Sequence, residues 1–117
     1  MEPASRAEPV IRALIERRVT VATAESLTGG LVCAALTSVP GASAVVRGGV
    51  VVYGTDLKVS LAGVDETALR QYGPVAAETA LAMAAGVRER LHADVGVATT
   101  GVAGPDRQDD LPPGTVH

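Results

Sequence analysis

A carboxylate, two hydroxyls and two glycines stand together in the segment ATAESLTGG, residues 22–30, where a β-branched run ends and an apolar run begins. Ser26 is a candidate nucleophile, because a serine at a strand-to-helix turn lies beside helix N–H groups that stabilise a developing oxyanion. Gly29 and Gly30 let a ligand approach the backbone closely. The alternative is that Ser26, or Thr28, caps the helix. The residue types alone leave both interpretations open.

A serine nucleophile requires a base, and the chain has a single lysine, Lys58. The two histidines, His92 and His117, fall at the end of a predicted helix and at the last residue, so a Ser-His-Asp triad is not expected. Near an apolar sheet edge the pKa of a lysine falls and its amine becomes a base. Tyr53, five residues before Lys58, would relay a proton or donate to an oxyanion. The plainer interpretations are a solvated lysine and a core aromatic residue.

A third polar segment, TTGVAGPD, follows another predicted strand at residues 99–106. It is either an ordinary turn or a loop whose backbone N–H groups hold a phosphate or an amide. Its candidate binding residues are Thr100, Gly101, Ala103, Gly104 and Pro105. The acidic residues in and after this segment could attract a metal ion, but a flexible acidic loop usually stays solvated. We therefore expect no metal and no cofactor.

The composition limits the classes of protein to consider. The chain has 117 residues, of which 47% are hydrophobic and 20% charged, and this suits one domain with a real core. Phe and Trp are absent, so Val, Ala and Leu must fill that core. The net charge of -3 and the lack of a basic cluster argue against nucleic-acid binding. No signal peptide and no membrane span are recognisable, and we expect a soluble, cytoplasmic domain.

The order of the predicted elements indicates an α/β layered sheet, because strands alternate with helices. Strands are expected at 19–24, 44–54, 94–101 and from 115, and helices at 9–18, 28–37, from 55, at 65–73 and at 74–93. Pro9 is expected in the first turn of its helix, and Thr55 and Asp65 are expected to cap theirs. The valine-rich run 44–54 is expected to be central and covered on both faces. Its Gly48–Gly49 pair indicates a bulge, a bend or two shorter strands.

The polar segments described above all follow predicted strands. Ligands of open α/β sheets bind beyond the carboxyl ends of the strands, so we expect these segments to gather at one edge of the sheet.

The ordered combination of AESLTGG, VPGAS, RGGVVVYGTDLK, YGPVAAETALAMAAGVRERLHADVGVATTGVAGP and PPGTV resembles the CinA C-terminal domain family. The likeness runs from Arg6 to the last residue, which makes residues 1–117 a single domain of this type. Characterised enzymes of the family are nicotinamide mononucleotide deamidases. The resemblance implies a three-layer α/β/α sandwich with a mixed, mostly parallel sheet. It also implies hydrolysis of the carboxamide of nicotinamide mononucleotide to nicotinate mononucleotide and ammonia.

The family's site residues are carried over where its motifs match. Its proposed nucleophile falls on Ser26, and the tyrosine and lysine of its Y-S-N-E-A-K block fall on Tyr53 and Lys58. Its S/T-G-I-A-G-P block falls on residues 100–105, which would hold the mononucleotide. The resulting hypothesis is that Lys58, assisted by Tyr53, deprotonates Ser26, while the N–H groups of residues 28–30 hold the oxyanion and no metal takes part.

The sequence also departs from the family pattern. Leu27 replaces a cysteine, YGTDLK replaces Y-S-N-E-A-K, DRQDD replaces a glycine-rich stretch, and the strand and helix expected after PPGTV are absent. These departures keep two alternatives open, a catalytically silent nucleotide-binding module and a hydrolase of another amide. An exposed sheet edge or absent terminal elements would favour association, so we expect a homo-oligomer.

Overall fold

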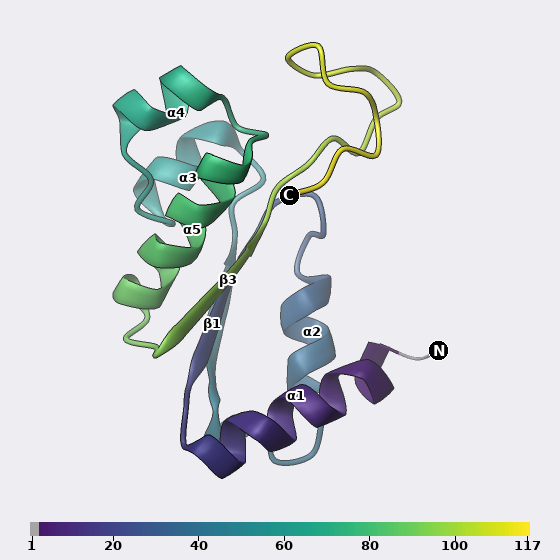
Figure 1. The fold of residues 1–117 in the computed structure, drawn as a ribbon, viewed down its shortest axis with the longest axis vertical. Coiled ribbons are helices and arrows are strands. Elements are labelled where there is room, and N and C mark those ends of the chain that lie inside the picture. Colours follow the sequence, from purple (N-terminus) through teal and green to yellow (C-terminus); the bar gives the residue numbers. More distant parts are fainter. Residues whose placement is uncertain (1–2) are drawn as a thin grey trace.

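The computed structural model describes residues 3–117, and side chains from Arg6 onward, as helices on both faces of a parallel sheet (Figure 1). Across that range the sheet has three strands in the order β2-β1-β3, and both pairings are parallel. The strands are β1 (Val21–Glu25), β2 (Val46–Val51) and β3 (Val95–Thr99). An antiparallel bridge joins Gly101 to Val116 beyond β3. The predicted three-layer α/β class with mostly parallel pairing is confirmed.

The helical layers each contribute to a separate apolar core. The helices are α1 (Pro3–Arg17), α2 (Leu31–Thr37), α3 (Thr55–Ser60), α4 (Glu66–Tyr72) and α5 (Ala77–Arg90), with a 3-10 turn η1 (Ala42–Ala44) before β2. In Figure 1, α3, α4 and α5 lie on one face of the sheet and α1 and α2 on the other. Ala22 and Ala24 of β1 pack with Met83 on the first face, and Val21 packs with Ile11 on the second. No helix within residues 3–117 is long and apolar enough to cross a membrane.

The central strand is β1, whose five residues are all buried. The valine-rich run at 44–54 forms β2 at the edge of the described sheet, and its residues alternate between half-buried and exposed. The prediction that this run is central was therefore wrong. Its β-branched residues suit an edge strand with one covered face as well as a central strand, so composition did not distinguish the two positions.

The glycine pair at 48–49 accompanies a β-bulge between β1 and β2. The register skips Arg47, and Gly49 then pairs with Thr23 of β1. A Cβ atom added to Gly49 would lie 2.2 Å from Thr23 Oγ1, so glycine is required where these strands meet. Of the three interpretations of the glycine pair, the bulge is confirmed.

The helix starts only partly follow the sequence signals. Asp65 caps α4 as predicted, because its Oδ1 accepts the N–H groups of the second and third residues of that helix at 2.8 and 3.1 Å. Pro9 is the seventh residue of α1 rather than a first-turn residue, and it is tolerated on the exposed side of the helix. Thr55 is the first residue of α3, and Gly54 holds the cap position without a side-chain hydrogen bond. The predictions for Pro9 and Thr55 were wrong.

Two glycines allow α5 to approach its neighbours closely. A Cβ atom at Gly86 of α5 would lie 1.7 Å from the carbonyl oxygen of Ala62, which follows α3. A Cβ atom at Gly96 of β3 would lie 2.0 Å from the carbonyl oxygen of Ala84 in α5. In a chain without Phe or Trp, glycine at these two positions lets the layers pack closely.

Candidate active site

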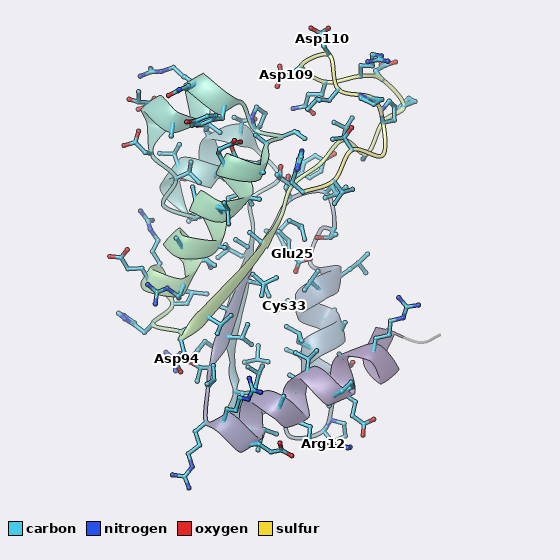
Figure 2. All side chains as sticks on the ribbon, viewed as in Figure 1. Arg12, Glu25, Cys33, Asp94, Asp109 and Asp110 are labelled. Atoms are coloured by element: carbon cyan, nitrogen blue, oxygen red, sulfur yellow. The ribbon has the colours of Figure 1, made fainter. Side chains whose placement is uncertain are left out.

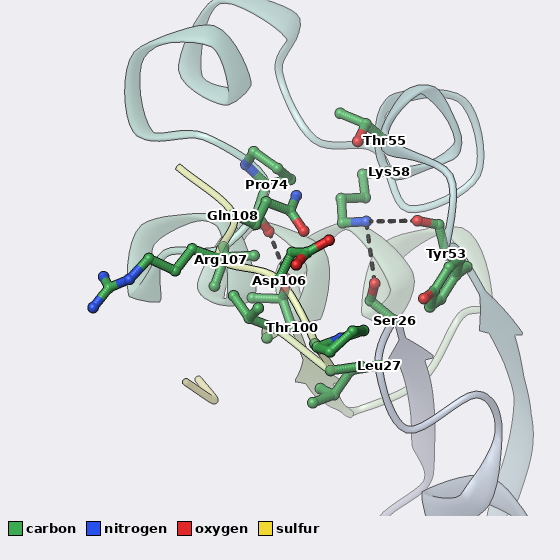
Figure 3. A pocket seen from close by; sticks show the side chains of 16 residues that line it. Ser26, Leu27, Tyr53, Thr55, Lys58, Pro74, Thr100, Asp106, Arg107 and Gln108 are labelled. Carbon is green, nitrogen blue, oxygen red and sulfur yellow. Dashed lines mark hydrogen bonds between the residues drawn. The ribbon is translucent and has the colours of Figure 1, made fainter. Parts of the chain in front are cut away.

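The carboxyl ends of the three strands meet at one edge of the sheet. Glu25, the last residue of β1, pairs with Val51 of β2 and with Thr99 of β3, so the segments after these residues lie together. They surround a cavity of about 310 Å³ (Figure 3). The predicted site residues that line it are Ser26, Tyr53, Lys58, Thr100, Gly101, Ala103, Gly104 and Pro105. The expected gathering of polar segments at the sheet edge is present in the structure.

The side chains of Ser26 and Lys58 meet in the wall of this cavity. Lys58 Nζ lies 3.3 Å from Ser26 Oγ, although 32 positions separate the two residues in the chain. The same amine donates to the backbone carbonyl oxygens of Val52 at 2.9 Å and of Tyr53 at 3.4 Å. Figure 3 shows its contacts with Tyr53 and Ser26. These carbonyls come from the segment that leaves β2, and Lys58 itself is carried by α3. Three hydrogen bonds therefore fix the amine beside the serine hydroxyl.

Lys58 is buried, with 2% of its surface exposed, so the interpretation as a solvated lysine was wrong. Burial lowers the pKa of its amine below the ordinary lysine value of 10.5. Within residues 6–117 it forms no ion pair with a carboxylate that would favour the charged form. Its partners are two carbonyls and a hydroxyl, which are neutral; the two N–H groups of a neutral amine suffice for the carbonyls, and its lone pair then faces Ser26 Oγ. Burial thus shifts the equilibrium toward the neutral amine, the form in which lysine accepts a proton.

The Ser26 side chain does not cap a helix. The cap position of α2 is Gly30, which makes no side-chain capping hydrogen bond, and α2 begins at Leu31 rather than at the predicted Thr28. The backbone N–H of Ser26 donates to the carbonyl oxygen of Thr99 at 3.0 Å, which fixes the residue beside the end of β3. The alternative of Ser26 as a cap was wrong, and its hydroxyl is directed to Lys58 instead.

Glu25 caps α2 in place of a serine or threonine, a role that the sequence analysis did not assign. Its Oε1 accepts from Thr28 Oγ1 at 2.6 Å and from the Val32 N–H at 2.9 Å, and its Oε2 accepts from the Cys33 N–H at 2.9 Å. Burial alone would raise the pKa of this carboxyl, but these hydrogen bonds outweigh burial and lower it. Figure 2 shows Glu25 near the end of α2 at which the chain enters the helix.

Thr28, Gly29 and Gly30 form the turn before α2 and do not line the cavity. The Gly29 N–H donates to the Ser26 carbonyl oxygen at 3.0 Å, and the Gly30 N–H is one of the groups that lower the pKa of the Glu25 carboxyl. The two glycines have φ values of 59° and 106°, a region that favours glycine. The geometry gives these residues a part in shaping the turn and does not place their N–H groups at the cavity.

The loop after β3 supplies the opposite wall of the cavity. Thr100 is buried, and its Oγ1 donates to the carbonyl oxygen of Pro74 in the segment before α5. A Cβ atom at Gly101 would lie 2.4 Å from the carbonyl oxygen of Thr115, so glycine is needed where the C-terminal residues pair with this loop. The loop is thus anchored on two sides near the strand and leaves residues 102–108 beside the cavity.

Tyr53 lies at the mouth of the cavity, with 68% of its surface exposed, so the interpretation as a core aromatic was wrong. Its contact with Lys58 runs through the backbone carbonyl. Within residues 6–117 its phenolic oxygen takes part in no hydrogen bond with Ser26 or Lys58. The structure therefore places the predicted third residue at the site, and its backbone rather than its hydroxyl holds the amine.

The acidic residues of the loop after β3 do not assemble a metal centre. Asp109 and Asp110 lie at the tip of this loop, away from Glu25 (Figure 2). Across the part of the chain that the structure describes, no three His, Cys, Asp or Glu side chains are grouped so that they could hold a metal ion.

Comparison with known proteins places this site in a family. The model of the CinA C-terminal domain matches residues 4–117. A CinA-like protein of Frankia casuarinae is 57% identical over 108 residues, which cover 92% of this chain and 25% of that protein. A putative competence-damage inducible protein of Halothermothrix orenii is 47% identical over 105 residues, or 89% of this chain and 25% of that protein. The chain spans about a quarter of the length of the curated relatives it matches.

Solved structures agree with the sequence comparison. A competence/damage inducible protein from Agrobacterium tumefaciens superposes with a TM-score of 0.90 at 41% identity, covering 97% of this chain and 70% of that one. A CinA superfamily protein from Klebsiella pneumoniae superposes with a TM-score of 0.94 at 32% identity, covering 99% of this chain and 73% of that one. Sequence and fold lead to the same assignment, and this chain belongs to the CinA C-terminal domain family.

Proposed function

We propose that the chain is an amidohydrolase that deamidates nicotinamide mononucleotide, with Ser26 as nucleophile and Lys58 as general base. The observation that carries the proposal is the 3.3 Å approach of the Lys58 amine to the Ser26 hydroxyl in the wall of a cavity. A serine hydroxyl needs an adjacent base to become a nucleophile, and a buried amine whose pKa lies below the ordinary lysine value is a better candidate for that base than a solvated lysine. No histidine is required in this arrangement.

The first half-reaction forms an acyl-enzyme. Neutral Lys58 takes the proton from Ser26 Oγ as that oxygen bonds to the carboxamide carbon, and the carbonyl electrons move onto the substrate oxygen. When the tetrahedral intermediate collapses, the C–N bond breaks. The Lys58 ammonium returns its proton to the departing nitrogen, which leaves as ammonia. The amine is then neutral again and ready for the second half-reaction.

The second half-reaction consumes water. Lys58 takes a proton from a water molecule while the water oxygen attacks the acyl carbon, and the bond to Ser26 Oγ then breaks as Oγ regains a proton from Lys58. The product is nicotinate mononucleotide. Each proton is passed through the same amine, whose position beside Ser26 is held by its hydrogen bonds to the Val52 and Tyr53 carbonyl oxygens.

The oxyanion needs donors other than those expected from the turn. The Gly29 N–H is already bonded to the Ser26 carbonyl, and the Gly30 N–H faces the Glu25 carboxylate. Leu27 follows the nucleophile and lines the cavity, and its N–H takes part in no hydrogen bond within the described residues. We assign the Leu27 N–H as an oxyanion donor, an interaction typically worth about 3 kcal/mol in such sites.

The choice of substrate rests on the family resemblance and on the shape of the site. A cavity of about 310 Å³ is at the lower end of the range for small-molecule sites and suits a mononucleotide ring and sugar. The loop predicted to hold the mononucleotide, residues 100–105, lines that cavity as the proposal requires. The names of the relatives do not specify a reaction.

A catalytically silent binding module is the alternative function. A buried lysine without a carboxylate partner lowers the stability of the fold. A general base needs such an amine beside the serine, whereas a module that only binds a nucleotide does not. The Ser26–Lys58 contact therefore favours the hydrolase. Calorimetry that shows binding of nicotinamide mononucleotide without turnover would instead support the silent module.

The decisive experiment measures ammonia release from nicotinamide mononucleotide by the chain and by two variants. Ser26→Ala and Lys58→Met are each expected to lower the rate by about 10³-fold or more. Ser60→Ala, an exposed serine in α3 outside the cavity, is the matched control and keeps the parental rate. Activity of Ser26→Ala at the parental rate would remove the nucleophile assignment. A panel containing nicotinamide, its riboside and glutamine tests hydrolysis of another amide.

A further inference from the structure

Asp106 brings a negative charge to the cavity wall opposite the nucleophile. It lines the cavity from the loop after β3, together with Gln108. In Figure 3 its carboxylate points toward the middle of the cavity, on the side of the Ser26 hydroxyl and the Lys58 amine, whereas the Arg107 guanidinium points away. Within residues 6–117 the Asp106 carboxylate forms no ion pair and no hydrogen bond. It is therefore free to interact with a bound molecule.

The charge balance of the cavity follows from these positions. Asp106 is the one acidic residue among the described residues that line the cavity. Burial lowers the pKa of the Lys58 amine and so weakens its positive charge relative to an ordinary lysine, and no carboxylate offsets that effect within residues 6–117. Asp106 and Lys58 line the same cavity from different parts of the fold, the loop after β3 and α3. With Arg107 turned outward, Asp106 supplies the negative charge of the cavity lining.

We propose that Asp106 selects substrates whose aromatic ring is positively charged, such as an N-substituted pyridinium carboxamide, over neutral rings of the same shape. The inference rests on the proposed function, because it takes the carboxamide carbon to lie at Ser26 Oγ. The ring nitrogen is then separated by one ring carbon from the carbon that bears the carboxamide, so the positive charge of the ring lies inside the cavity that Asp106 also lines. Asp106 is exposed, so water weakens the attraction between its carboxylate and a cationic ring, and the preference we expect is modest. A cationic ring also favours the neutral form of the Lys58 amine.

The test compares two ligands that differ in ring charge. Nicotinamide mononucleotide has a cationic ring, and its reduced dihydropyridine form has a neutral one, while both carry the same ribose and phosphate. Their dissociation constants are measured by calorimetry in the Ser26→Ala background, so that neither ligand is consumed. We expect the cationic form to bind about tenfold more tightly, a preference worth about 1.4 kcal/mol, and Asp106→Asn to bring the ratio close to one.

Asp110→Asn is the matched control, because it removes a carboxylate from the same loop but from outside the cavity lining. It is expected to keep the parental ratio. Equal weakening of both ligands by Asp106→Asn leaves the ratio of their dissociation constants unchanged; it would assign the residue to the ribose or to loop structure and would overturn the inference. Unchanged dissociation constants for both ligands would overturn it as well. Ammonia release by the unsubstituted chain is measured separately. If Asp106→Asn abolishes the preference for the cationic ligand but the unsubstituted chain releases no ammonia, charge selection is retained and the proposed function is rejected. If ammonia is released but Asp106→Asn leaves the preference unchanged, the proposed function is retained and charge selection is rejected.

Discussion

Glu25 and Ser26 are consecutive residues whose side chains serve opposite faces of the sheet. The Glu25 carboxylate binds the first turn of α2, and the Ser26 hydroxyl lies beside Lys58 on the side of α3. Successive side chains of a strand point to opposite faces, and β1 keeps this alternation to its end: Val21 packs toward α1 and Ala22 toward α5. The strand thus fixes a helix with one residue and presents a nucleophile with the next.

Replacing Glu25 with alanine tests its role as the anchor of α2. The change leaves the N–H groups of Val32 and Cys33 without their acceptor in a partly buried place, so we expect a loss of about 1–2 kcal/mol in the free energy of unfolding. Urea denaturation measures it. Glu16→Ala, at an exposed position of α1, serves as the control and changes stability by less than about 0.5 kcal/mol. A similar small change at Glu25 would contradict the anchoring role.

The position of Glu25 explains where sequence reasoning succeeded and where it stopped. Short-range signals such as the Asp65 cap were predicted correctly, because donor and acceptor lie within three residues. Glu25 caps a helix that begins six residues later, and the intervening turn can be seen only in three dimensions. A carboxylate that immediately precedes a candidate nucleophile at a strand end was the available signal.

The gathering of site residues could also be predicted, but not their contacts. Parallel strands share one carboxyl edge, so Ser26 and the segments after β2 and β3 had to lie together. The burial of Lys58 depends on how α3 folds back over the end of β2, and no periodicity in the sequence specifies that angle. The edge position of β2 depends likewise on tertiary pairing, which its valine-rich composition does not encode.

Tyr53→Phe distinguishes two roles for this tyrosine. Because only the backbone carbonyl of Tyr53 contacts Lys58 in the structure, removal of the hydroxyl should leave kcat for ammonia release within about threefold of the parental value. A phenol that relays the proton would make the same change cost about 10²-fold or more. Steady-state kinetics on nicotinamide mononucleotide separate these outcomes. The larger loss would show that the phenol turns into the site when substrate binds.

Gly86→Ala tests the close packing of α5. The added methyl group would lie 1.7 Å from the Ala62 carbonyl oxygen, and a backbone atom cannot move aside as a flexible side chain can. We expect a loss of about 2–3 kcal/mol in stability, despite the higher helix propensity of alanine. Thermal unfolding followed by circular dichroism measures it. Ala85→Gly, at an exposed position of the same helix, is the control and costs about 1 kcal/mol. A stabilised Gly86→Ala variant would contradict the packing.

The pH dependence of the reaction should report the Lys58 amine. Only the neutral amine accepts the proton of Ser26, so kcat/KM is expected to rise with pH and to level off above the pKa of Lys58 in the folded chain. Burial places that pKa below 10.5, so the plateau begins below the range of an ordinary lysine. Lys58→Arg, which keeps a cation that does not deprotonate, should be inactive at every pH. A flat profile for the parental chain would exclude Lys58 as the base.

The stability of the chain should depend on pH through the same residue. The pKa of Lys58 is lower in the folded chain than in the unfolded chain, so the unfolded chain binds more protons between these two values. Stability contributed by this residue therefore rises with pH across the window from the lowered pKa up to about 10.5, by at most about 1.4 kcal/mol per pH unit, and is constant outside it.

Lys58→Met removes this dependence, because methionine does not titrate. The free energy of unfolding of the parental chain is expected to rise relative to that of the variant as the pH increases through that window. Below the window, where the parental chain buries an ammonium, the variant has its greatest advantage in stability. Urea denaturation of both proteins at a series of pH values gives the difference. Parallel curves for the two proteins would mean that Lys58 has the same pKa folded and unfolded, and the amine could not then serve as a base near neutral pH.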